Sequence, residues 1–136
     1  MTRIVLASSS PRRRHMLELL GLDFVVAVPD VDETPEPGEV PSAYVDRVAR
    51  MKAEAVVADS AWLVIAADTT VDVDGEILGK PEDGDDARRM LWRLSGRVHK
   101  VHTGVVVRRH DTTISAVAHT EVELVPFSAS VVEWYV

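Results

Sequence analysis

The sequence contains no cysteine, and this absence excludes several kinds of chemistry. Disulfide bonds, thiolate nucleophiles and zinc sites built on cysteine are all ruled out. Long apolar runs are missing too, so no segment reaches the roughly 20 residues of a membrane-spanning helix. The apolar run at residues 4–7 is far too short for the core of a signal peptide. We therefore expect a cytoplasmic protein with no membrane partner.

An excess of positive charge is also missing. The chain has 22 acidic and 15 basic residues and a net charge of −7. Proteins that bind nucleic acids usually present a basic field to the phosphate backbone, so we expect no nucleic-acid partner. The composition, with 46% hydrophobic residues over 136 positions, is typical of one soluble globular domain.

Hydrophobic periodicity predicts that strands and helices alternate along the chain. Strands are predicted over residues 4–6, 24–28, 62–67, 98–108 and 120–124. The apolar runs among them, such as residues 24–28, are expected to be buried. Helices are predicted over residues 11–21, 42–59, 83–94 and 130–136. Asp74 and Gly75 indicate a hairpin turn between two short strands. This order predicts an α/β fold, a mixed sheet with helices packed on it.

The most informative stretch is the turn between the first strand and the first helix. Ser10 and Pro11 form a helix start in the preferred order, a serine N-cap followed by proline. Free backbone N–H groups and the positive end of the helix dipole favour an anion at such a turn. The positive charges of Arg12 and Arg13 are unfavourable at the positive end of the helix dipole, and a bound phosphate would offset this unfavourable interaction. The alternative is an ordinary capped helix with a solvated basic turn.

Two more predicted strands end in polar residues. Glu33 lies in an acidic, proline-containing loop after the strand 24–28, and Asp68 directly follows the strand 62–67. Ligands bind beyond the carboxyl ends of strands in open α/β sheets, so one cleft could collect these groups. Hydroxyl groups, arginines and carboxylates together suit metal-assisted hydrolysis of a phosphate ester or anhydride.

Asp68 is the strongest candidate for a general base. It closes the most apolar strand, and desolvation raises the pKa of a carboxyl group. A divalent metal would help by lowering the pKa of the attacking water. The alternative for Asp68 is a turn carboxylate, and Glu33 could be a metal ligand or a solvated loop acid. Lys52 could be a surface residue of a long helix, whereas Lys80 has the more unusual position between glycine and proline.

The histidines indicate no metal site. His99 and His102 lie three residues apart on a predicted strand, so their side chains should point to opposite faces. His15, His110 and His119 are isolated in the sequence. Glycine-rich nucleotide loops of the Walker or Rossmann type are absent as well.

Several short segments, taken in order, resemble the Maf family signature. They are residues 6–13 (LASSSPRR), 31–34 (VDET), 52–53 (KA), 67–69 (ADT), 79–81 (GKP), 94–96 (LSG) and 102–105 (HTGV). Together they cover essentially the whole chain. The resemblance implies a mixed, largely antiparallel twisted sheet with flanking helices and a nucleotide cleft, similar to inosine triphosphate pyrophosphatase.

The resemblance also implies a nucleoside triphosphate pyrophosphatase, which hydrolyses the bond between the α and β phosphates with a divalent metal, Mg or Mn. Asp68 matches the family's general base, and Glu33 and Asp68 are the expected metal ligands. The matched substrate-binding positions are Ser8, Ser10, Arg12, Arg13, Glu33, Lys52, Thr69 and Lys80. Arg12 and Thr69 resemble the subgroup that prefers dTTP and UTP.

Family members continue beyond the position that matches Val136, through a segment that contributes to base recognition. Residues 1–136 are therefore expected to form a single domain that is incomplete relative to the family. This difference keeps open an alternative, a nucleotide-binding regulatory protein linked to septum formation. A phosphatase that releases inorganic phosphate is a further alternative. The expected partner is a nucleoside triphosphate, and a homodimer is allowed for.

Overall fold

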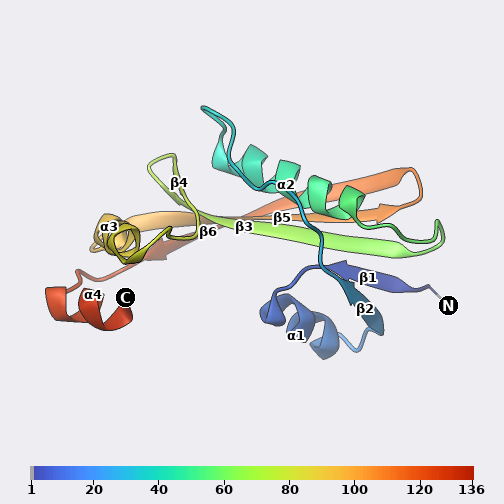
Figure 1. Ribbon diagram of the computed structural model, residues 1–136, viewed down its shortest axis with the longest axis horizontal. Helices are drawn as coiled ribbons and strands as arrows, with labels where there is room; N and C mark the ends of the chain where they lie inside the picture. Colours follow the sequence, from blue (N-terminus) through green and yellow to red (C-terminus); the bar gives the residue numbers. More distant parts are fainter. Residues whose placement is uncertain (1) are drawn as a thin grey trace.

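The computed structural model describes residues 2–136, which fold around one mixed sheet (Figure 1). The strands are β1 (Ile4–Ala7), β2 (Phe24–Ala27), β3 (Leu63–Val73), β4 (Glu76–Leu78), β5 (Val98–Arg109) and β6 (Thr112–Glu123). The helices are α1 (Pro11–Leu19), α2 (Pro41–Ala55), α3 (Gly84–Leu94) and α4 (Ala129–Tyr135). The predicted α/β class is confirmed. Within the described residues, no helix is long and apolar enough to cross a bilayer.

Strand β3 is the centre of the sheet, whose order is β2-β1-β3-β5-β6. One edge of β3 pairs with antiparallel β5 over most of its length. The other edge pairs first with parallel β1, up to Ala66, and then with antiparallel β4 from Val71 onward. Between these two partners, residues 67–70 have an edge that neither β1 nor β4 covers. This interruption is where the cleft described below opens.

Helix α2 packs on one face of the sheet, and α1 and α4 lie on the other side (Figure 1). The strands contribute the buried residues Val5, Ala7, Val64, Ala66 and Val106 to the core under α2. The helix side contributes Ala49, Ala53 and Val56. A side chain on Gly104 of β5 would meet the backbone oxygen of Val45 at 2.6 Å, so the helix can approach β5 only because residue 104 is glycine. Gly104 pairs with Asp68, and α2 is therefore held close to that residue.

Local signals in the sequence correctly located several element boundaries. The Ser10 hydroxyl accepts a hydrogen bond from the Arg13 N–H at 3.4 Å, which confirms the predicted N-cap of α1. Asp74 and Gly75 have φ angles of 50° and 86°, the left-handed pair that a two-residue hairpin turn requires.

Other predictions were wrong because pairing between distant strands decided the outcome. The predicted strand end before Asp68 does not exist, since β5 supports β3 as one continuous strand through to Val73. The predicted strand 120–124 is only the end of β6, which starts at Thr112. The apolar run 24–28 forms an edge strand rather than a buried one, with Val25 52% exposed. Helix α2 ends at Ala55, short of the predicted residue 59.

Candidate active site

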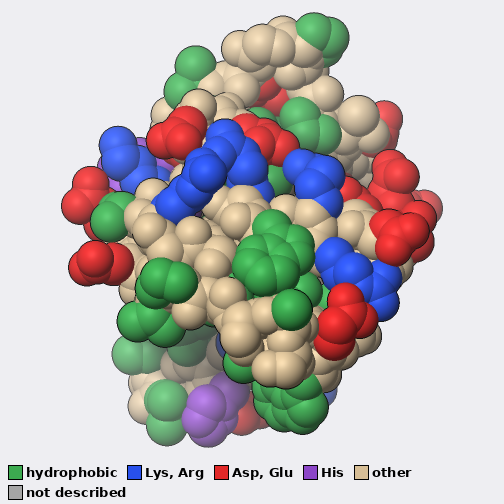
Figure 2. All heavy atoms as spheres, turned by 90° about the vertical axis from the view of Figure 1, so that its left-hand side faces the viewer, with side chains coloured by type: hydrophobic (Ala, Val, Ile, Leu, Met, Phe, Trp, Pro, Cys, Tyr) green, Lys and Arg blue, Asp and Glu red, His purple; other side chains and the backbone are tan. Residues whose placement is uncertain are grey.

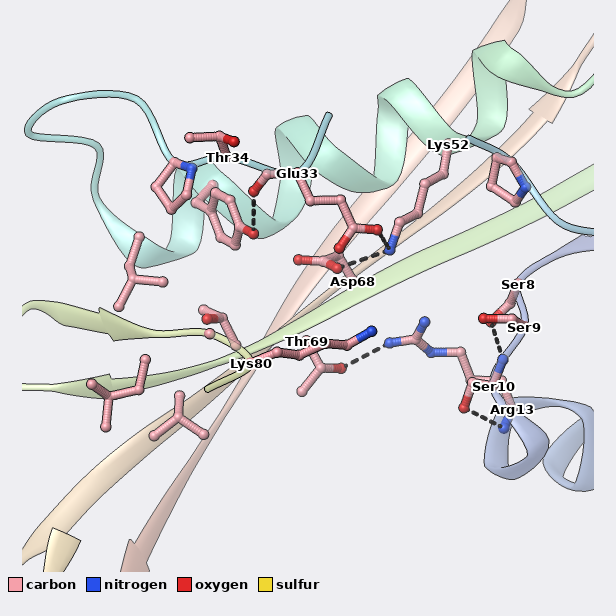
Figure 3. Close-up of a pocket in the computed structure, with 18 of the residues that line it drawn as sticks. Ser8, Ser9, Ser10, Arg13, Glu33, Thr34, Lys52, Asp68, Thr69 and Lys80 are labelled. Carbon is pink, nitrogen blue, oxygen red and sulfur yellow. Dashed lines mark hydrogen bonds and ion pairs between the residues drawn. The ribbon is translucent and has the colours of Figure 1, made fainter. Parts of the chain in front are cut away.

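A cleft of about 1190 Å³ opens at the uncovered edge of β3. Its walls are the turn before α1, the loop after β2, helix α2 and the loop after β4 (Figure 3). All the predicted site residues line it: Ser8, Ser10, Arg12, Arg13, Glu33, Lys52, Asp68, Thr69 and Lys80. The structure therefore brings together residues from five separate segments of the chain.

Asp68 and Lys52 form the buried centre of the cleft. Lys52 Nζ lies 3.0 Å from Asp68 Oδ1 and 2.9 Å from Glu33 Oε1, so one ammonium group contacts two carboxylates. Asp68 is only 6% exposed, and its Oδ2 atom is buried without a hydrogen-bond partner among residues 2–136. Burial raises the pKa of Asp68, and the hydrogen bond and charge of Lys52 oppose that rise.

Asp68 therefore holds one oxygen against a lysine and leaves the other oxygen without a protein partner. A buried acceptor without a donor is costly in a folded protein, so such an atom calls for a functional explanation. A proton, a water molecule or a cation would each satisfy Oδ2. The arrangement suits a base whose ionised form is maintained by a neighbouring cation.

The turn before α1 is held by its own serine side chains. The Ser10 N–H donates to the Ser8 hydroxyl at 3.0 Å, and the Ser10 hydroxyl caps the helix as described above. Each serine oxygen is thus an acceptor for the backbone, and each keeps a hydroxyl hydrogen that can be donated to a ligand. The turn presents these donors together with the start of α1, a favourable setting for a phosphate.

The two arginines of this turn differ in their surroundings. Arg13 donates from one Nη atom to the Ala67 carbonyl at 3.0 Å and from the other to the Thr69 hydroxyl at 3.1 Å. The Thr69 hydroxyl is also 3.0 Å from the Thr103 hydroxyl on β5. Burial lowers the pKa of Arg13, and the charge of Asp68 opposes that change. Arg12 is exposed and forms no hydrogen bond or ion pair within the described part of the chain. Arg12 is therefore the arginine that remains free for a ligand.

The acidic loop that carries Glu33 is fastened to α2. The Tyr44 hydroxyl donates to the Glu33 carbonyl at 2.7 Å, and burial raises the pKa of Tyr44 to about 12, so the hydroxyl keeps its proton. Arg47 donates to both carboxylate oxygens of Glu39, at 2.6 and 2.8 Å, and to the Thr34 carbonyl at 3.2 Å. These contacts fix the loop at Glu33 and along the segment that follows it.

Sequence reasoning did not identify Tyr44 or Arg47 as site residues. Tyr44 lies within the predicted helix 42–59, where nothing in the sequence links it to the acidic loop that its hydroxyl reaches. Arg47 and Glu39 are separated by the start of α2, and no periodic signal links a loop acid with a helix arginine. Their pairing follows only from the path of the loop.

The fold pairs a histidine that is isolated in the sequence. Nδ1 of His119 lies 2.6 Å from Nδ1 of His102 on the neighbouring strand. Nε2 of His102 lies 2.8 Å from the Asp72 carboxylate. Residues 2–136 contain no group of three or more histidine, aspartate or glutamate side chains placed to hold a metal ion. The expectation that the histidines form no metal site stays a prediction.

The model of the family described as Maf-like protein matches residues 3–136. The chain is 49% identical over 137 residues to the dTTP/UTP pyrophosphatase of Myxococcus xanthus, and the match covers 98% of this chain and 68% of that protein. It is 48% identical over 137 residues to the dTTP/UTP pyrophosphatase of Symbiobacterium thermophilum, covering 100% of this chain and 71% of that protein. Both relatives are thus longer than this chain.

Solved structures of HAM1 proteins have a similar fold. The HAM1 protein of Coxiella burnetii aligns with a TM-score of 0.61 at 19% identity and covers 90% of this chain and 73% of its own. The Ham1 protein of Staphylococcus aureus aligns with a TM-score of 0.60 at 18% identity and covers 90% of this chain and 71% of its own. At this level of identity the likeness concerns the fold, and it agrees with the architecture expected from the sequence.

Proposed function

The chain belongs to the family of Maf-like proteins, and from this premise we propose that it hydrolyses nucleoside triphosphates to the monophosphate and pyrophosphate. The observation that carries the proposal is Asp68, a buried carboxylate of the cleft lining, with one oxygen against Lys52 and the other buried without a hydrogen-bond partner among residues 2–136. The names of the relatives, dTTP/UTP pyrophosphatase, support dTTP and UTP as the substrates to test first.

The two sides of the cleft have different tasks in this proposal. Ser8, Ser10 and Arg12 bind the phosphate chain, because the turn offers hydroxyl donors and a free guanidinium group. Lys80 adds positive charge from the loop after β4, and Figure 3 shows its side chain directed from that loop toward Arg13. These groups hold the triphosphate and stabilise the negative charge that develops on the leaving pyrophosphate.

Asp68 acts on the water molecule that attacks the phosphate. Its Oδ2 atom accepts a proton from the attacking water as the new P–O bond forms and the bond between the α and β phosphates breaks. The raised pKa of Asp68 makes it a better proton acceptor than an ordinary carboxylate. Lys52 keeps the carboxylate ionised before the reaction and orients it through the hydrogen bond to Oδ1.

A divalent cation, Mg²⁺ or Mn²⁺, fits the donor set of this cleft. Asp68 Oδ2 has no hydrogen-bond partner in the described part of the chain, and the Glu33 carboxylate, which shares Lys52 with Asp68, is about half exposed. Mg²⁺ in nucleotide enzymes is usually held by one or two carboxylates together with phosphate oxygens, so a pair of acids suffices. When bound, the cation supplies charge neutralisation for the phosphates and a lowered pKa for its water.

A product-resolved assay tests the proposed function. The chain is incubated with dTTP, UTP, ATP and GTP, each with Mg²⁺ or Mn²⁺, and pyrophosphate and inorganic phosphate are quantified separately. We expect pyrophosphate and the monophosphate in equal amounts, with dTTP and UTP turned over fastest. Inorganic phosphate as the first product would indicate a phosphatase. Binding measured by calorimetry without turnover would instead favour a nucleotide-binding regulatory protein.

A further inference from the structure

A short chain of hydrogen bonds crosses three strands beside the cleft. His102 on β5 is only 6% exposed, and its two ring nitrogens both have partners. Nδ1 lies 2.6 Å from Nδ1 of His119, its register partner on β6. Nε2 lies 2.8 Å from Oδ2 of Asp72 on β3. None of these side chains lines the cleft, so the proposed reaction does not use them directly.

Asp72 connects this chain to the hairpin of β3 and β4. Its second oxygen, Oδ1, accepts a hydrogen bond from the Gly75 N–H at 2.7 Å. Gly75 belongs to the left-handed turn at the tip of the hairpin. One carboxylate therefore binds the hairpin turn with one oxygen and the buried ring of His102 with the other.

The β3–β4 hairpin is also attached to the rest of the molecule by ion pairs and by apolar packing. Strand β4 has three residues and pairs with β3 at the side of the main sheet. At the end of the molecule shown in Figure 2, acidic and basic side chains lie close together, and Glu76 of β4 accepts hydrogen bonds from Arg89 and Arg93 of α3. These ion pairs are partly exposed and thus contribute modestly. Ile77 of β4 also packs against a buried cluster on α2, and Leu78 is itself buried. The contact between Asp72 and His102 adds a buried polar attachment at the base of the hairpin turn.

The hairpin in turn carries one wall of the cleft. Ile77 and Leu78 of β4 line it, and the chain continues directly into Gly79 and Lys80. Lys80 follows the last residue of β4 by only two positions. A change in the tilt of the hairpin would therefore move Lys80 relative to the turn before α1. Small displacements matter here, since a catalytic or binding group must be held within a fraction of an ångström.

We propose that His102 is a positioning residue, which acts through Asp72 to hold the β3–β4 hairpin so that Lys80 reaches the phosphates. The role of Lys80 in binding phosphates rests on the proposed function, whereas the role of His102 in holding the hairpin does not. The donor is His102 Nε2–H and the acceptor is the Asp72 carboxylate. A neutral His102 that carries its proton on Nε2 has a free acceptor at Nδ1, and His119 supports this form by donating its own Nδ1–H to that atom.

This proton arrangement defines an informative pair of variants. In His102→Gln the amide nitrogen can take the place of Nε2 and donate to Asp72. In His102→Leu the side chain has a similar bulk and no donor. His110→Gln is the matched control, because His110 lies in the turn of the same β5–β6 pair with a side chain that is 67% exposed.

The test combines backbone hydrogen exchange with steady-state kinetics on dTTP. In His102→Leu we expect faster hydrogen exchange confined to residues 74–80. We also expect KM to rise by about tenfold, which corresponds to the loss of roughly one hydrogen bond to a charged group. The value of kcat should change less than KM. His102→Gln should restore most of both properties, and His110→Gln should match the unmodified chain.

The outcomes that would overturn the proposal are distinct. Unchanged exchange at residues 74–80 in His102→Leu would show that the hairpin does not depend on His102. Faster exchange throughout β1, β5 and α2 would show a general role in stability instead of positioning. If His102→Leu fails to fold, Asp72→Asn serves in its place, because the amide keeps the acceptor for Gly75 and loses the acceptor for His102. Absence of turnover in the unmodified chain would refute the proposed function alone, and the exchange measurement would still decide whether His102 holds the hairpin.

Discussion

The ammonium group of Lys52 lies 3.0 Å from Asp68 Oδ1, and both side chains are largely buried. The pair joins helix α2 to the middle of β3, at the point where the neighbouring strand β1 has ended. Burial favours the neutral form of the carboxyl group, and the lysine favours the charged form. The balance leaves the pKa of Asp68 above its ordinary value, as a general base requires.

The pair predicts how activity depends on pH. Asp68 must be ionised to accept a proton, so kcat/KM should fall on acidification with a midpoint above the ordinary carboxyl value of about 3.9. Lys52→Met removes the hydrogen bond and charge that oppose the rise of the pKa, so the midpoint should move to higher pH. Lys100→Met, at an exposed lysine of β5, is the control and should leave the midpoint unchanged. A midpoint that stays fixed or falls in Lys52→Met would contradict this account.

The same pKa shift makes a prediction about stability. The pKa of Asp68 is higher in the folded state than in the unfolded chain, so its ionised form opposes folding. That cost is present at pH 7 and disappears as the pH falls below the unfolded pKa. Asp68→Asn should therefore not lower the free energy of unfolding at pH 7, and any gain should vanish in acid. Denaturant titrations at both pH values measure this, and a variant that is less stable at pH 7 would refute it.

Arg12 and Arg13 should have separable roles. Arg12 is exposed and free, so Arg12→Ala should weaken nucleotide binding and leave the melting temperature unchanged. Arg13 joins α1 to the backbone and side chain of β3, so Arg13→Ala should also lower stability, by about 1–3 kcal/mol for the lost hydrogen bonds.

A double-mutant cycle separates these contributions. Arg13→Ala and Thr69→Val remove the same hydrogen bond, so their effects on stability should not add. Arg12→Ala and Thr69→Val should be additive, because no contact joins Arg12 to Thr69 within residues 2–136. Additivity in the first pair would show that the contact with Thr69 carries no energy.

The loop that carries Glu33 should depend on Arg47. Arg47→Ala frees Glu39 and the Thr34 carbonyl, so Glu33 should be held less precisely and the apparent metal affinity should fall by roughly tenfold or more. Arg50→Ala is a control on the same helix, because Arg50 pairs with Asp46 and Ser115 away from the loop. Metal titrations of the initial rate compare the two variants, and equal effects would exclude a specific role for Arg47.

Local chemistry made much of the site predictable. The N-cap at Ser10 and the turn at Asp74 and Gly75 depend on adjacent residues, so their signals are visible in the sequence. The cleft-lining residues were predicted from motifs that occur in a fixed order, and the fold brings them to one place. The family resemblance added the role of each residue, which spacing alone left open.

The features that escaped prediction depend on distant partners. Asp68 lies inside β3 because β5, more than 30 residues later in the chain, pairs along that strand. His119 meets His102 through the register of β5 and β6, which no local pattern specifies. Arg47 finds Glu39 because the acidic loop folds back over α2. In each case a contact between residues that are distant in the sequence determines the local structure.

The most direct test of the central claim is the rate of pyrophosphate release from dTTP, with Mg²⁺, by the unmodified chain and by Asp68→Asn. Asparagine keeps the shape of the side chain and cannot accept the proton of the attacking water. The account predicts a rate that is lower by about 10²–10⁴-fold, the usual contribution of a positioned general base. Nucleotide binding to Asp68→Asn, measured by calorimetry, should persist. Pyrophosphate release by Asp68→Asn at the unmodified rate would contradict the assignment of Asp68 as the base.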